Sequence, residues 1–272
     1  MRPGRSIARA ASPVWDVLFP PACWVDGNLV QDDHGGKGGL AGNGLSETAR
    51  HAIGRLAFQP YCLHCGLTVG PYELHDARDP CARCGTREVG VVRIARVGTF
   101  SEPLVTLVHR LKFGRSWELG DVLAPFLYSA MLRVSEIAAV PVDVMIPVPL
   151  HWLRRARRGF NQAEELARSV GKLSHWPMVH ALHRRRHTSE QALASSPTAR
   201  AANLRGAFAL MRAAKRGALA DKHVWLLDDV STTGATLHAA ATALRKLPSG
   251  MRPASINAAV LCVTDNYSPP AT

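Results

Sequence analysis

Residues 223–237, HVWLLDDVSTTGATL, give the strongest indication of the fold of this chain. An apolar run at 224–227 is short enough for a buried parallel strand, and two adjacent acids, Asp228 and Asp229, follow it. A turn of small hydroxyl residues comes next, and apolar residues at helical spacing begin at Leu237. Because ligands of open α/β sheets bind at the carboxyl ends of strands, the stretch predicts a ligand site at this turn.

The turn has the chemistry of a phosphate site. Backbone N–H groups at a helix N-terminus bind phosphate together with Ser and Thr hydroxyls, and Gly234 lets the backbone approach the ligand closely. The two carboxylates would repel a second phosphate, so they suit a sugar diol or a divalent cation. An ordinary strand–turn–helix with a Ser or Thr N-cap explains any single residue of the turn. A phosphorylated ribose explains the whole string.

The string DDVSTTGAT resembles the ribose-phosphate signature of type I phosphoribosyltransferases, and the match has no gap. The resemblance implies that Asp228 and Asp229 form the catalytic pair and hold the 2′ and 3′ hydroxyls of the ribose. It also implies which turn residues hold the 5′-phosphate of a phosphoribosyl diphosphate ligand: Ser231, Thr232, Thr233, Gly234, Ala235 and Thr236.

Four of the six cysteines form a C-x2-C-x15-C-x2-C motif, namely Cys62, Cys65, Cys81 and Cys84. This spacing is typical of zinc sites, because each C-x2-C turn directs two thiolates at one tetrahedral ion. Disulfides are the weaker alternative without a signal peptide, and a lost or redox-active site is the other one. Four thiolates leave no open position on the metal, so the predicted zinc is structural.

Composition bounds the classes of function. The chain has 272 residues, 47% of them hydrophobic, a formal charge of +12 and a pI near 10.0. The charge favours acidic ligands or nucleic acid, but solubility explains it equally well because no helix face is continuously basic. No apolar run approaches the about 20 residues that cross a bilayer, and the N-terminus lacks an uninterrupted apolar segment. We therefore expect a cytoplasmic protein.

The chain is predicted to have three parts: an N-terminal region at 1–58 with a Gly-rich linker, a zinc-ribbon module at 59–88 and a larger domain at 89–272. Strands are expected at 91–100, 142–148, 206–211, 224–227 and 256–263. Helices are expected at 45–58, from Pro103 onward, at 117–138 and within 154–173. The predicted fold is α/β, a type I phosphoribosyltransferase-like twisted, mainly parallel sheet with flanking helices, preceded by a small four-cysteine zinc ribbon.

Three further segments resemble one family when they are taken with the cysteines and DDVSTTGAT. They are HRLKFG at 109–114, the stretch at 144–168 that contains IPVPL and RRGFNQ, and the stretch at 182–208. The family is ComF, also called GntX-like, whose members join a zinc ribbon to a type I phosphoribosyltransferase domain. The resemblance covers residues 60–265. It implies that the protein binds a phosphoribosyl diphosphate ligand together with Mg²⁺. It also implies a role in natural competence, with single-stranded DNA and DNA-processing proteins as partners.

The segment at 144–168 resembles the family's pyrophosphate loop followed by a basic cluster. Arginines in such a cluster can hold a diphosphate, while a solvated helix start and a nucleic-acid contact are alternatives. Arg158 and Asn161 are the favoured ligand residues, and the other members of the cluster are Arg154, Arg155 and Arg157. Lys112 of the LKFG motif either reaches an anionic group or extends along the surface as a helix residue.

The polar segment at 182–205 predicts a long mobile loop and resembles the flexible hood that closes over the sugar diphosphate. The family positions that match within it are Arg184, Thr188, Gln191, Arg200 and Asn203.

Family members often carry a further pair of C-x2-C motifs upstream, and here both are degenerate. The first has become Cys23-Trp24-Val25-Asp26, and the second is Ser46-Glu47-Thr48-Ala49. One thiolate cannot hold zinc, so we expect no upstream metal site and loose order in 1–58.

Two classes of function follow from the sequence. One is a Mg-dependent enzyme that transfers a pentosyl group from phosphoribosyl diphosphate, a glycosyltransferase in which the acid pair orients the ribose. The other is a non-catalytic competence factor that binds single-stranded nucleic acid or senses phosphoribosyl diphosphate. Aromatic residues make up 6% of the chain and are not interleaved with the basic cluster, so no stacking platform is predicted.

Overall fold

The computed structural model describes residues 22–27, 44–70, 73–74, 76–84, 90–114, 116–185, 204 and 206–265. The chain divides into two compact units, Met1–Ala52 and Ile53–Thr272. Four of the five candidates in the predicted hood lie outside the described residues: Thr188, Gln191, Arg200 and Asn203.

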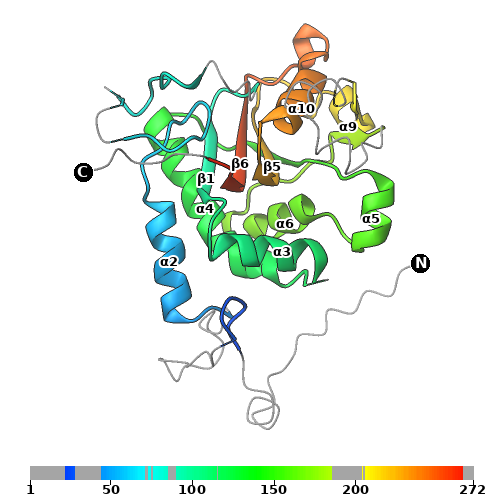
Figure 1. The fold of residues 1–272 in the computed structure, drawn as a ribbon. Helices are drawn as coiled ribbons and strands as arrows, with labels where there is room; N and C mark the ends of the chain where they lie inside the picture. Colours follow the sequence, from blue (N-terminus) through cyan, green and yellow to red (C-terminus); the bar gives the residue numbers. More distant parts are fainter. Residues whose placement is uncertain are drawn as a thin grey trace. The chain divides into compact units, whose positions relative to one another are not determined.

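Four parallel strands form the sheet of the larger unit, in the order β1-β6-β5-β2 (Figure 1). They are β1 Ile94–Thr99, β2 Val144–Pro147, β5 His223–Ser231 and β6 Ser255–Val263. β5 and β6 lie in the middle and are nine residues long. β6 and the part of β5 at 224–227 are near-continuous apolar runs because helices and loops cover the two faces of the sheet. This architecture confirms the predicted mainly parallel α/β fold.

The two faces of the sheet have different partners. On one face, α4 (Leu119–Ala138) and α6 (Gln162–Ser174) pack against each other and against the strands (Figure 1). On the other, α10 (Ala235–Arg245) and the cysteines share one apolar cluster with Val224 and Leu226 of β5. The cysteine loops are therefore part of the main core of this unit.

Helix α3 (Leu104–Phe113) begins after Pro103, as predicted. Its buried side chains have the i, i+3, i+4, i+7 spacing of an amphipathic helix, and they are Leu104, Leu107, Val108 and Leu111. The polar side of the last turn carries Lys112, which the register of the helix brings to the end of β5.

The segment at 154–173 contains two helices rather than one. α5 (Trp152–Arg158) ends at Gly159, whose φ of 86° lies in the left-handed region that favours glycine. Asn161 is extended at the N-cap of α6. The break separates a short helix without buried residues, which holds the arginines, from a well-buried one.

Part of the predicted mobile loop is a strand. β3 (Leu182–Arg184) pairs antiparallel with β4 (Phe208–Leu210) in a separate two-stranded sheet. The pairing places Arg184 opposite Phe208. A four-residue helix, α9 (Arg212–Lys215), follows β4, and a short 3-10 helix, η2 (Ser249–Met251), precedes β6.

The described residues of the degenerate motif form hydrogen bonds at the positions where metal ligands would stand. The Ser46 hydroxyl donates to Asp26 Oδ2 at 3.0 Å, and the Ala49 N–H donates to Ser46 Oγ at 3.2 Å. Cys23 is buried and accepts a bond from the Val25 N–H at 3.4 Å. Helix α2 (Glu47–Ala57) begins at this point.

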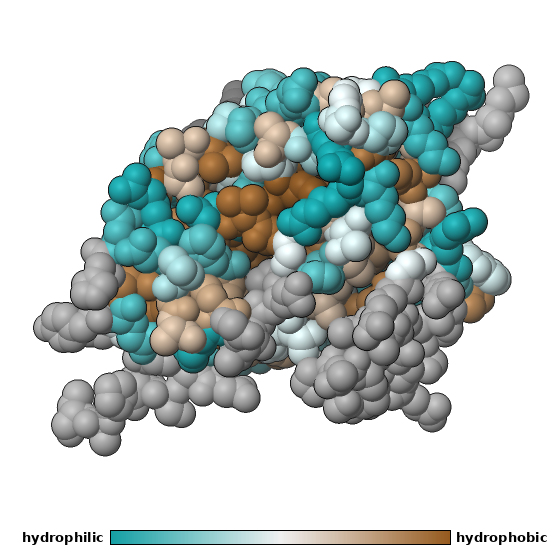
Figure 2. Space-filling view, turned by 90° about the horizontal axis from the view of Figure 1, so that it is seen from above, coloured by the Kyte–Doolittle hydropathy of each residue, from teal (hydrophilic) through white to brown (hydrophobic). Residues whose placement is uncertain are grey.

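The described surface is mixed in polarity. Figure 2 shows a largely hydrophilic face with apolar residues gathered near its middle. The exposed large apolar side chains of the chain include Phe113, Trp117 and Trp152, at 55%, 55% and 67% exposure. Among the described helices, none combines the length and the apolar character needed to cross a membrane.

Candidate functional site

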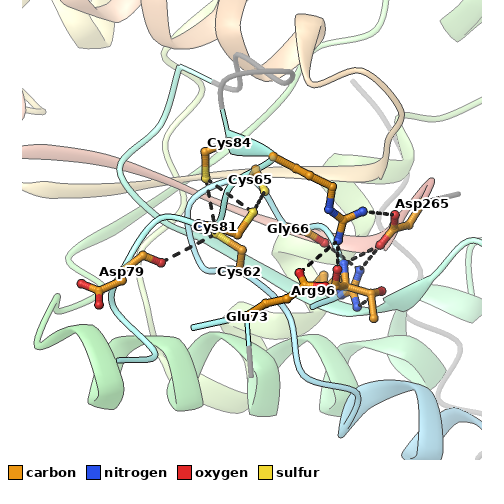
Figure 3. Close-up of polar contacts among 11 residues, drawn as sticks. Cys62, Cys65, Gly66, Glu73, Asp79, Cys81, Cys84, Arg96 and Asp265 are labelled. Carbon is orange, nitrogen blue, oxygen red and sulfur yellow. Dashed lines mark hydrogen bonds and ion pairs between the residues drawn. The ribbon is translucent and has the colours of Figure 1, made fainter. Parts of the chain in front are cut away.

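The four predicted zinc ligands converge. The Sγ atoms of Cys62, Cys65, Cys81 and Cys84 all lie within 4.8 Å of one another (Figure 3). Cys62 and Cys84 are 3.5 Å apart, and Cys65 and Cys81 are 3.6 Å apart. Four thiolates at about 2.3 Å from a tetrahedral zinc lie about 3.8 Å from one another, so the cluster fits this ion.

The backbone around the cysteines has knuckle geometry. The Gly66 N–H donates to Cys62 O at 2.8 Å, and Gly66 has a φ of 75°. The Cys62 sulfur in turn accepts a bond from the Cys81 N–H at 3.4 Å, which links the two C-x2-C loops. The four sulfurs and the backbone thus form a closed site without a free position for a substrate.

The cysteine thiols of the cluster differ in pKa. The hydrogen bond with Cys65 is the main cause that lowers the pKa of Cys62 to about 4. The same bond, followed by burial, raises the pKa of Cys65, and burial raises that of Cys84 to about 12. Neighbouring thiolates repel one another, so a dication is needed to hold all four sulfurs deprotonated.

The predicted acid pair lies inside the end of β5. Asp228 pairs with Val260 of β6, and the Asp229 N–H donates to Asp228 Oδ1 at 2.9 Å. Burial, and then the charge of Asp229, raises the pKa of Asp228 to about 7. Asp228 is therefore only partly ionised near neutral pH, so it can donate as well as accept hydrogen bonds.

Two predicted cations lie beside the acid pair. Lys112 Nζ is 3.3 Å from Asp229 Oδ2, with side-chain exposures of 20% and 12%, so this lysine pairs with a carboxylate. The charge of Arg184 also favours ionisation of Asp228. Burial, followed by repulsion from Arg154, lowers the pKa of Arg184 itself. Residues from β5, α3 and β3 thus meet at the carboxyl end of the sheet.

The turn after the acid pair leaves its backbone donors open. Ser231 is buried as the last residue of β5, and Gly234, with a φ of 80°, is the N-cap of α10. In the part of the chain that the structure describes, no acceptor bonds the N–H of Thr232, Thr233 or Gly234. The Ala235 N–H reaches Thr233 Oγ1 at 3.4 Å. The turn is therefore equipped with donors for an anion.

Arg158 and Asn161, the favoured ligand residues of the basic segment, are each held by contacts with neighbouring loops and helices. Asn161 is 6% exposed and donates to Val148 O at 3.1 Å, which holds the IPVPL loop. Arg158 donates to Gln162 Oε1 at 3.1 Å and lies over the Phe113 ring, 5.2 Å from its centroid. Their roles as ligand residues stay predictions.

A cavity of about 520 Å³ opens beside Arg158. Trp117 and Phe160 line it, and two ion pairs, Lys172 with Asp121 and Arg168 with Glu165, complete its wall. With Phe113 under Arg158, aromatic side chains lie next to the basic cluster. Tertiary packing thus brings Phe113 and Trp117, which lie about forty residues earlier in the chain, next to the basic cluster.

Sequence reasoning missed three residues that connect the two sites. Arg96 is fully buried in β1, and Thr264 and Asp265 follow β6. An arginine inside the apolar strand IARVGT is a signal, because a buried guanidinium needs partners. Nothing in the local spacing marks Thr264 or Asp265.

Comparison with known proteins places the chain in a family. No family model matches it. It is 33% identical over 210 residues to competence protein F of Haemophilus influenzae, which covers 76% of this chain and 87% of the relative. It is 32% identical over 179 residues to the DNA utilization protein YhgH of Escherichia coli K12, covering 65% and 74%. Competence protein ComFC of Bacillus subtilis is 28% identical over 183 residues, covering 66% and 70%. The chain therefore belongs to the ComF family of competence proteins.

Proposed function

We propose that the chain binds a 5-phosphorylated ribose of the phosphoribosyl diphosphate class at the turn between β5 and α10, and that it does so in DNA uptake and natural competence. The backbone donors of Thr232, Thr233 and Gly234, which have no acceptor among the described residues and follow the acid pair at the end of β5, are the observation that carries this proposal. The names of its relatives, a competence protein and a DNA utilization protein, support the biological setting.

The turn and the acid pair bind different parts of the ligand. The turn donates N–H groups to the 5′-phosphate, while Asp228 and Asp229 face the two ribose hydroxyls. Arg184 and Lys112 keep the acid pair from repelling the anionic ligand. Mg²⁺ bound with the diphosphate would neutralise the charge that develops on the leaving pyrophosphate. In the enzymatic form of the proposal the residues then stabilise transfer of the pentosyl group by electrostatics.

Calorimetric titration with phosphoribosyl diphosphate and Mg²⁺ tests the site. We expect Asp228→Asn and Asp229→Asn each to weaken binding by about tenfold or more, because each removes a charge-assisted hydrogen bond to a ribose hydroxyl. Glu136→Gln, which removes an exposed carboxylate of α4, is the matched control and should bind as the wild type does. Equal affinity of all three variants would contradict the proposal.

Release of pyrophosphate from the bound ligand separates an enzyme from a sensor. Turnover that rises with candidate acceptor bases and disappears in Asp229→Asn supports the enzymatic form. Binding without any release of pyrophosphate supports a protein that senses the ligand and does not turn it over.

A second candidate function is binding of single-stranded nucleic acid, and the cavity beside Arg158 favours it. Trp117 and Phe160 offer faces on which bases stack, and Arg158 adds a cation beside them. The arginines of α5 extend the positive surface for the phosphate backbone.

Fluorescence anisotropy with a labelled single-stranded oligonucleotide tests this second function. We expect Trp117→Ala and Arg158→Ala to weaken binding several-fold, and the affinity to fall as salt rises. Lys222→Ala is the matched control, because it removes an exposed charge at the opposite end of β5. Loss of affinity in the control, with none in the two cavity variants, would rule out the cavity as the binding surface.

A further inference from the structure

A buried arginine holds the first cysteine loop to the sheet. Arg96 of β1 is 0% exposed, and it donates to Gly66 O at 2.6 Å and to Thr68 Oγ1 at 2.8 Å (Figure 3). Its guanidinium also lies 4.7 Å from the centroid of the Tyr61 ring. A charged group without access to water requires such partners, so the loop and the strand are held in one relative position.

Asp265, two residues beyond β6, joins both cysteine loops. Its carboxylate is 2% exposed, accepts the N–H of Thr68 after the first loop, and lies 4.0 Å from Arg96. Arg83, which stands between Cys81 and Cys84 in the second loop, donates to Asp265 Oδ1 at 3.4 Å and also to Thr68 O. One carboxylate thus depends on the relative position of the two loops, which the four sulfurs determine.

The residue before Asp265 holds the phosphate-binding turn. The Thr264 N–H donates to Ser231 O at 3.1 Å, and its hydroxyl donates to Thr232 O at 3.2 Å. Ser231 and Thr232 are the first residues of that turn. A path therefore runs from the cysteine loops to the backbone that is proposed to bind phosphate: hydrogen bonds and ion pairs reach Asp265, the peptide link leads to Thr264, and two hydrogen bonds lead on to the turn.

We propose that Thr264 and Asp265 are positioning residues that couple metal occupancy of the cysteine cluster to the affinity of the turn for a sugar phosphate. With the metal bound, the two loops keep Asp265 in place, and Thr264 holds the turn with its donors directed at one position. When the metal leaves, Arg83 and Thr68 separate and the hold on Ser231 and Thr232 weakens. This inference rests on the proposed function.

Coupling between two binding sites is reciprocal, so the ligand must also raise the affinity for the metal. The test uses the zinc-loaded full chain in equilibrium competition with a zinc-selective chelating dye, with and without ribose 5-phosphate. In the wild type we expect ribose 5-phosphate to raise the zinc affinity by about fivefold or more. Removal of the zinc should weaken the affinity for ribose 5-phosphate, measured by calorimetry, by the same factor.

Two variants locate the coupling. Thr264→Val removes one hydroxyl bond to the turn, and Asp265→Asn removes the charge that pairs with Arg83 and Arg96. Both are expected to keep their zinc while the ratio of the two zinc affinities, with and without ribose 5-phosphate, falls toward one. Thr106→Val is the matched control, because it also removes one threonine hydroxyl bond, here an exposed one to Glu102, and its ratio should equal that of the wild type.

The outcomes separate this inference from the proposed function. Ribose 5-phosphate that binds the wild type without changing its zinc affinity overturns the coupling and leaves the proposed function intact. Ribose 5-phosphate that fails to bind the zinc-loaded wild type overturns both. If Asp265→Asn does not fold, Thr264→Val decides alone, and a wild-type ratio in that variant overturns the role of Thr264.

Discussion

The cysteine cluster and the turn at the end of β5 balance their charges in opposite ways. In the cluster, four sulfurs face one another and the backbone N–H groups are largely bonded, so that one cation completes a closed site. At the turn, Asp228 and Asp229 are balanced from outside by Lys112 and Arg184, and three backbone N–H groups, at 232–234, have no acceptor among the described residues. A closed arrangement stabilises the fold, whereas an open one keeps binding capacity at some cost in stability.

Removal of one sulfur from the closed cluster should have the largest effect. Cys81→Ser should lose the zinc and lower the free energy of unfolding by about 3 kcal/mol or more, because metal affinity is part of the folding energy at such sites. Elemental analysis and thermal unfolding measure the two effects. Cys23→Ser, in the degenerate motif, should keep one zinc per chain. A Cys81→Ser protein that still holds one zinc contradicts the tetrathiolate site.

Loss of the cation beside the acid pair should have the next largest effect. Lys112→Met leaves the largely buried Asp229 carboxylate without its partner, and we expect the free energy of unfolding to fall by about 2 kcal/mol. Denaturant titration measures this loss. The double variant Lys112→Met with Asp229→Asn should lose less than the sum of the single variants, and strict additivity would show that the two residues do not interact.

The raised pKa of Asp228 predicts a pH-dependent stability with a defined sign. The folded state keeps this proton up to pH about 7, whereas the unfolded chain releases it near the ordinary value of 3.8. The contribution of Asp228 to stability is therefore full below about pH 4 and is lost as the pH rises to 7. Asp228→Asn removes this loss, so it should raise the unfolding temperature at pH 8 relative to the wild type. A lower unfolding temperature of the variant at pH 8 would contradict the raised pKa of Asp228.

The smallest effect is expected at the surface of the cysteine loops. The side-chain bonds of Arg78 lower the pKa of Asp76 to about 2, but both side chains are exposed to solvent. Such pairs are screened by water and salt. Arg78→Ala should therefore leave zinc content and unfolding temperature unchanged, and a clear loss of zinc would show that the closed site extends to its surface.

The spacing of apolar residues along the chain predicts those strands and helices whose burial depends only on residues close in sequence. The apolar runs of β5 and β6 and the i, i+3, i+4 spacing of α3 report burial directly. The break between α5 and α6 does not follow from the sequence, because a glycine within a basic segment is compatible with a continuous helix until its φ of 86° is known. The strand at 182–184 does not follow either, because its partner, β4, comes more than twenty residues later in the chain.

By itself, the sequence determined the parallel α/β sheet, the four-cysteine motif that could hold a metal ion and the acid pair with its turn, since each is a short motif whose chemistry is local. Only the tertiary structure decided that Lys112 meets Asp229, that Phe113 lies under Arg158, and that Arg96, Thr264 and Asp265 connect the metal loops to the turn. Charged side chains find partners by distance in the folded state rather than along the chain, and that distance is set by how the strands and helices pack.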